Sequence, residues 1–224
     1  MSLKPQKRSD AGKRWMRERR DRGIQIKPEY HLIVTEGRET EPAYFQAIQS
    51  IINQRYRNRI HLEVHGEGDN TLSLYEKARL RAESSPNVYK HVWVVYDTDD
   101  FPAEHINLTA ELCKQNSSSE TQYHALWSNQ CFELWYLLHF SYFQSDVHRR
   151  EYWPKLTEQL ERIGKGAYVK NRPDMYDTLR PYMKDGIKNA QKLDKHNQGR
   201  KPSDAAPGTK VYELIDALKS YLID

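Results

Sequence analysis

Two groups of carboxylate side chains lie where apolar segments of the sequence end. Glu36 closely follows the apolar run 31–34, and Asp97 and Asp99 follow the run 92–96. Such runs are typical of buried strands. Carboxylates that lie close together repel one another and need protons or cations for stability. Oxygen ligands without a nearby group of Cys or His residues favour Mg²⁺ or Mn²⁺, and these ions polarise phosphoryl oxygens and activate water. A phosphodiester is therefore the expected substrate.

The strands and helices that must position these carboxylates alternate along the chain. The pattern predicts strands over 31–34, 60–64, 92–96 and 123–127, and helices over about 41–55, through 72–80 and near 103–115. Thr40 is the expected N-cap of the first helix. This order predicts an α/β fold, with a mainly parallel four-stranded sheet flanked by helices. Ligands bind such sheets at the carboxyl ends of the strands. If the first and third strands are neighbours, Glu36, Asp97 and Asp99 meet in one crevice.

Other polar residues adjoin the same strand ends. The further candidates for the site are Glu39, Glu41, Asp100, Asn129 and Glu133. Asp100, which precedes Phe101 and Pro102, is better explained as a helix cap. Glu133 lies in an otherwise apolar run, so it either faces the positive end of a helix dipole or belongs to the site.

Two observations concern histidines, and neither predicts a zinc or catalytic site at His61, His65 or His139. His61 and His65 lie on one face of a strand, but no third ligand adjoins them. His139 lies in an apolar helix, where a structural role is expected.

The positive charge of the chain is concentrated at its N-terminus. The 224 residues carry a net charge of +4, but residues 1–23 hold nine basic and three acidic side chains, so the remainder carries −2. The N-terminal tail is either a solubilising arm or an arm that binds phosphates. A second basic stretch with aromatic residues, near Lys170, is either a solvated face or part of a nucleic-acid groove. The expected nucleic-acid-binding residues are Lys13, Arg14, Arg17, Arg19, Arg20 and Lys170.

The chain divides into three parts by composition. We expect a basic, flexible tail over 1–28, an α/β core over 29–140 and a helical C-terminal region over 141–224. Within the last 95 residues, helices are predicted over 131–140, 152–163, 175–193 and 211–222. The chain has two cysteines, which argues against a disulfide scaffold, and its longest apolar run is far shorter than the ~20 residues that span a membrane. A soluble cytoplasmic protein with no membrane partner is expected.

Four segments together resemble a known family. They are Ile33–Gly37, Thr40–Phe45, Val92–Asp99 and Ser128–Phe140. They resemble the RloB-like family of Toprim-related bacterial phage-defence and abortive-infection proteins, over roughly residues 30 to 140. One departure is Gln130, where proline is expected.

This resemblance implies a Toprim-like fold and a role for each acidic residue. Glu36 would take part in metal binding or general acid–base work, and Asp97 and Asp99 would hold a divalent metal. Relatives of this kind are often encoded beside an ATPase and act as effector nucleases. The resemblance therefore implies an ATPase partner from the same operon and a nucleic-acid substrate, RNA or DNA.

Two functions from different classes follow. The leading hypothesis is a phosphodiesterase or nuclease that depends on Mg²⁺ or Mn²⁺ and acts in phage defence. The alternative is a non-catalytic module that binds nucleic acid or a partner and is regulated by an ATPase. An effector that is inactive until an ATPase releases it is a third hypothesis.

Overall fold

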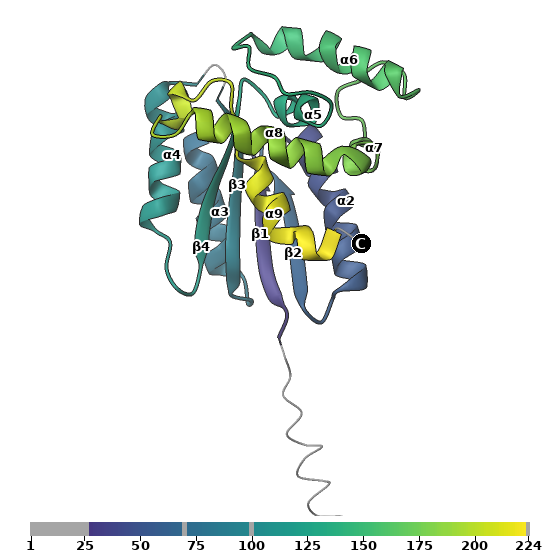
Figure 1. The fold of residues 1–224 in the computed structure, drawn as a ribbon. Helices are drawn as coiled ribbons and strands as arrows, with labels where there is room; N and C mark the ends of the chain where they lie inside the picture. Colours follow the sequence, from purple (N-terminus) through teal and green to yellow (C-terminus); the bar gives the residue numbers. More distant parts are fainter. Residues whose placement is uncertain (1–26, 69–70, 99–100, 223–224) are drawn as a thin grey trace, which may run out of the picture.

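The protein is built on a four-stranded parallel sheet (Figure 1). The computed structural model describes residues 27–68, 71–98 and 101–222. The strands are β1 (Glu29–Thr35), β2 (Ile60–Gly66), β3 (Tyr89–Thr98) and β4 (Gln122–Asn129), in the spatial order β2-β1-β3-β4. The expected α/β fold is confirmed, and the first and third strands are neighbours.

The strands form because both faces of the sheet are covered. Leu32 and Val34 of β1 are fully buried on one face, and Ile33 is fully buried on the other. A strand buried on both sides needs a continuous apolar run rather than an alternating one. The apolar segments of β1 and β3 meet this requirement.

Helices cover the two faces unequally. The Leu32 face packs against α3 (Thr71–Ser84) and α4 (Ala103–Gln115). The Ile33 face packs against α2 (Thr40–Arg55) and the C-terminal helices, which share one hydrophobic core. The C-terminal helices are α5 (Glu133–Leu138), α6 (Tyr152–Arg162), α7 (Met175–Leu179), α8 (Met183–His196) and α9 (Val211–Leu222). Figure 1 shows α8 and α9 crossing in front of the sheet.

Three sequence predictions about helices are wrong in detail. The helix expected over 175–193 is interrupted by a 3₁₀ turn, Arg180–Tyr182, where Pro181 has no main-chain N–H to donate. The helix expected over 131–140 is shortened to α5. Thr40 is not an N-cap, because α2 begins at Thr40 itself, and the Thr40 hydroxyl donates to Asn171 Oδ1 at 2.8 Å. Within the described ranges, no helix is long and apolar enough to cross a membrane.

Candidate active site

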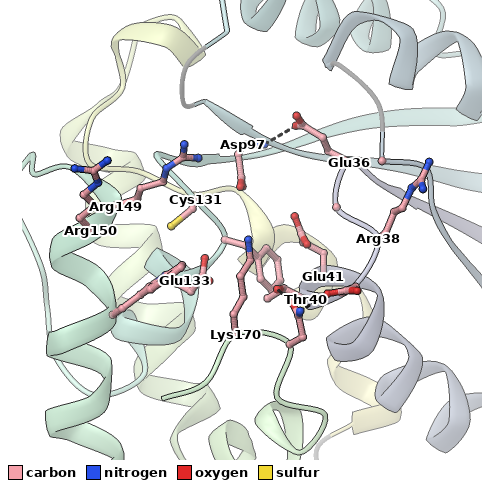
Figure 2. A pocket seen from close by; sticks show the side chains of 16 residues that line it. Glu36, Arg38, Thr40, Glu41, Asp97, Cys131, Glu133, Arg149, Arg150 and Lys170 are labelled. Atoms are coloured by element: carbon pink, nitrogen blue, oxygen red, sulfur yellow. Dashed lines mark hydrogen bonds between the residues drawn. The ribbon is translucent and has the colours of Figure 1, made fainter. Parts of the chain in front are cut away.

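Glu36 and Asp97 meet at the carboxyl edge of the sheet. The main-chain N–H of Glu36 donates to the Val95 carbonyl at 2.9 Å, which extends the pairing of β1 with β3 beyond the end of β1. The main-chain N–H of Asp97 donates to Glu36 Oε2 at 3.1 Å (Figure 2). The crossover that makes β1 and β3 neighbours therefore joins residues that are far apart in sequence.

Glu41 and Glu133 form a second pair of carboxylates in the same cleft. Glu41 lies in the first turn of α2 and Glu133 is the first residue of α5, and both are buried. A Cβ on Gly37 would overlap the Glu41 carboxylate in its present position, and glycine leaves room for it there. The Tyr168 hydroxyl donates to Glu133 Oε1 at 2.9 Å. Burial, reinforced by the charge of Glu133, raises the pKa of Glu41 to about 7.

The carboxylates line a cleft of about 810 Å³ that also has a basic and aromatic side. Figure 2 shows Arg149 and Arg150 at one side of the cleft and Lys170 reaching between Glu41 and Glu133. Trp153, which is 44% exposed, lines the same cleft. Negative and positive side chains thus face one space, an arrangement suited to a cation and a phosphate together.

Local structure holds the two arginines in place. They belong to a 3₁₀ turn, Arg149–Glu151, that leads into α6. The main-chain N–H of Arg149 donates to Gln130 Oε1 at 3.2 Å, and that of Arg150 donates to His148 Nδ1 at 3.2 Å. Gln130 has a φ of 65°, which proline cannot adopt because its ring holds φ near −65°. The departure from the family pattern at this position therefore matches the local backbone.

Lys170 is positioned by its neighbour in the chain. Asn171 has a φ of 67° and accepts a hydrogen bond from the Thr40 hydroxyl. Its Nδ2 donates to Glu39 Oε2. These two bonds attach the loop that carries Lys170 to the start of α2, beside Glu41.

The comparison with protein-family models matches the model described as RloB-like protein over residues 31–218. The chain belongs to the RloB-like family. The match extends through α8 into α9, well beyond the segments on which the resemblance rested, and it includes every residue that lines the cleft. Comparisons with curated proteins and with solved structures gave no match.

Most of the candidate residues within the described ranges line one cleft of this RloB-like protein. The candidates lining it are Glu36, Glu39, Glu41, Asp97, Glu133 and Lys170. Asn129 ends β4, is buried, and is not among the lining residues; its Oδ1 has no hydrogen-bond partner within the part of the chain that the structure describes. The candidates outside the described residues are Lys13, Arg14, Arg17, Arg19, Arg20, Asp99 and Asp100.

The sequence did not single out the other members of this RloB-like cleft. Arg149, Arg150 and Trp153 lie in the helical C-terminal region, where the sequence pointed only to the basic stretch near Lys170. Two adjacent arginines with a tryptophan three residues later form a pattern that can contact phosphates and bases of nucleic acid. Their position opposite the carboxylates depends on how the C-terminal helices pack against the sheet.

Cys131 also lines the cleft. Burial, with the charges of Glu133 and Asp97, raises the pKa of its thiol. This shift favours the thiol over the thiolate, the form that acts as a nucleophile.

Proposed function

We propose that this RloB-like protein is a divalent-metal-dependent phosphodiesterase that cleaves nucleic acid and acts as the effector of a phage-defence system. The observation that supports it most directly is the contact between Glu36 and Asp97 at the carboxyl edge of the sheet, in a cleft shared with Arg149 and Arg150. The defence role and an ATPase partner from the same operon are implied by the resemblance to phage-defence proteins.

The donor set of the cleft fits Mg²⁺ or Mn²⁺. Glu36 and Asp97 would hold the ion with Asp99, which follows in the sequence, and Glu41 and Glu133 supply further oxygens. Oxygen donors of this kind are preferred by hard divalent cations. The raised pKa of Glu41 reflects the cost of burying one carboxylate beside another, and a cation would relieve it. When bound, such an ion polarises a phosphoryl oxygen and lowers the pKa of water.

The side chains of the protein would bind the substrate and handle protons. Arg149, Arg150 and Lys170 would donate charge-assisted hydrogen bonds to the phosphate oxygens. Glu36 would either bind the metal ion or act as a general base. Before an ion binds, Glu41, with its pKa raised to about 7, can accept or donate a proton near neutral pH. Trp153 offers an exposed ring on which a nucleobase can stack.

The test is cleavage of RNA and DNA pools by the full chain, with Mg²⁺, with Mn²⁺ and with chelator. We expect Asp97→Asn and Glu36→Gln each to lower metal-dependent cleavage at least about 100-fold, because each removes a charge that holds the ion. Glu158→Gln is the matched control, since Glu158 is an exposed carboxylate on α6 that pairs with Arg162. Its activity should equal that of the unmodified protein.

The same assays are repeated with any ATPase that is encoded in the same operon, so that an effector requiring release is not mistaken for an inactive protein. Cleavage that survives both substitutions would contradict the proposal. Binding of nucleic acid without cleavage, with and without metal and ATPase, would favour the non-catalytic module.

A further inference from the structure

A group of histidines lies at the opposite end of the same sheet. His31 of β1, His91 of β3 and His124 of β4 come from three adjacent strands. The ring centroids of His31 and His91 are 4.7 Å apart, and those of His91 and His124 are 5.1 Å apart. Glu29 completes the group, with its Oε1 at 2.8 Å from His31 Nε2.

An irregularity in the sheet brings two of these histidines together. Tyr30 pairs with Tyr89, whereas His31 pairs with His91, so the register shifts between the two pairs. Without this extra residue, Lys90 would face His31. Bulges of this kind redirect side chains, and here the bulge puts two imidazoles side by side.

The donor atoms are spaced for a metal ion. One donor atom each from Glu29, His31 and His91 lie within 4.8 Å of one another, and His91 Nε2 is 3.9 Å from Glu29 Oε1. Ligands of a tetrahedral zinc ion are about 3 to 3.5 Å apart, given Zn–N distances of about 2.0 Å. Binding of an ion would require the side chains to rotate until the donor atoms have this spacing. Glu29 is 49% exposed while His31 is 3% exposed, so an ion could enter from the Glu29 side and keep a water ligand.

His124 is placed to orient His91. Its Nε2 lies 2.9 Å from His91 Nδ1. If His91 uses Nε2 for a metal, its Nδ1 carries a proton and donates to His124. Metal-bound histidines are commonly fixed by such a hydrogen bond from the other ring nitrogen. Burial also lowers the pKa of both His91 and His124 to about 4, so that their rings are neutral at neutral pH.

We propose that Glu29, His31 and His91 form a binding site for a transition-metal ion of the Zn²⁺ class, with His124 as a positioning residue. Two imidazoles and one carboxylate suit Zn²⁺, Co²⁺ or Ni²⁺ better than Mg²⁺. The site is separate from the carboxylate cleft. Asp97 lies further along β3 than His91, and a rise of about 3.3 Å per residue puts the two roughly 20 Å apart.

Trp93 competes with the metal for His31. An indole N–H can only donate, and Trp93 Nε1 donates to His31 Nδ1 at 3.3 Å. Without metal, His31 therefore carries its proton on Nε2 and donates it to Glu29. An ion on Nε2 displaces that proton, and the proton then required on Nδ1 breaks the bond to Trp93. Removal of the indole N–H should thus strengthen metal binding.

The experiment is titration of the untagged, chelator-treated full chain with Zn²⁺ by calorimetry, and with Co²⁺ by visible absorption. We expect one ion per chain and the intense absorption of tetrahedral Co²⁺. Glu29→Gln, at an exposed position where folding is not at risk, and His91→Ala should each weaken Zn²⁺ binding at least about tenfold. Trp93→Phe should bind Zn²⁺ more tightly than the unmodified chain.

Two variants serve as controls. His65→Ala removes a half-exposed histidine of β2 whose Nε2 is 3.8 Å from Glu63, and it should leave Zn²⁺ affinity unchanged. Asp97→Asn should also leave it unchanged, which separates this site from the cleft. Equal Zn²⁺ affinity of the unmodified chain, Glu29→Gln and His91→Ala would overturn the proposal. A loss of Zn²⁺ affinity in His65→Ala equal to that in His91→Ala would overturn it as well. Weaker Zn²⁺ binding by Trp93→Phe than by the unmodified chain would contradict the competition between Trp93 and the metal for His31.

Discussion

The two ends of the sheet carry different chemistry on the same strands. At the carboxyl end, β1 and β3 lead to Glu36 and Asp97, and the cleft around them combines oxygen donors with basic side chains. At the amino end, β1 and β3 bring His31 beside His91, where the donors are two imidazoles and one carboxylate. In Figure 1 the amino ends of the strands point away from α5 and α6, which border the cleft.

Burial acts on both ends in the same physical way. It raises the pKa of Glu41 to about 7 and lowers that of His91 to about 4, and each shift favours the neutral form. The consequences differ. A neutral imidazole is ready to bind a metal, whereas a buried carboxylate needs a cation before it can be charged. Binding of a metal ion should therefore change the protonation of the carboxylates at the carboxyl end more than that of the imidazoles at the amino end.

The largest effect in this comparison is expected from the basic side of the cleft. Replacing Arg149 and Arg150 together by alanine should weaken binding of nucleic acid about 10- to 100-fold. The slope of log affinity against log salt should become shallower by about 1 for each phosphate that an arginine no longer neutralises. The main-chain bond from Arg149 to Gln130 does not depend on the side chain removed. The measurement is affinity at several salt concentrations.

The matched control removes two positive charges from a helix outside the cleft. Lys184 and Lys188 are on α8 and do not line the cleft. Replacing both by alanine should change affinity little, and Zn²⁺ affinity should not change in either double variant. Equal losses of nucleic-acid affinity in the two variants would show that the arginines act only through net charge.

An intermediate effect is expected from Glu41. Its pKa is about 7 in the folded protein and 4.5 ordinarily, so the folded state binds more protons between these values. The free energy of unfolding should therefore fall by about 1 to 3 kcal/mol as the pH rises from about 4.5 to 7. In Glu41→Gln this loss should be absent, and added Mg²⁺ should reduce it in the unmodified protein. Urea denaturation at pH 5 and pH 8 measures both effects. An unchanged pH dependence in Glu41→Gln would contradict the assignment of the shift to this residue.

The smallest effect is expected from Tyr168→Phe. This change removes the hydroxyl that donates to Glu133, at a cost of about 1 kcal/mol of stability, and leaves the ring in place. It should also alter the Mn²⁺ concentration needed for cleavage. Tyr212→Phe is the control. The Tyr212 hydroxyl donates a similar hydrogen bond to Asp194, and neither Tyr212 nor Asp194 lines the cleft. A comparable change in Mn²⁺ dependence in both variants would argue against a role for Tyr168 in positioning Glu133.

Local patterns account for the parts of the fold that were predicted well. The helix over 103–115 was predicted at its observed limits, and each predicted strand lies within an observed one. Helix starts and interruptions were harder to predict. The break at Pro181 has a local cause, the missing N–H of proline, which the prediction over 175–193 did not take into account. The start of α2 at Thr40 is accompanied by a tertiary contact, the bond from Thr40 to Asn171, that no local pattern encodes.

The sequence by itself determined the strand–helix order and the placement of Glu36 and Asp97 just after or at the ends of strands, because hydrophobic periodicity acts over neighbouring residues. Only the tertiary structure decided which distant residues share a space. Glu41 meets Glu133 because α2 and α5 pack in one core, and His31 meets His91 because a bulge shifts the register of two strands that are not consecutive in the chain. These contacts arise from long-range packing and register, which composition and spacing do not specify.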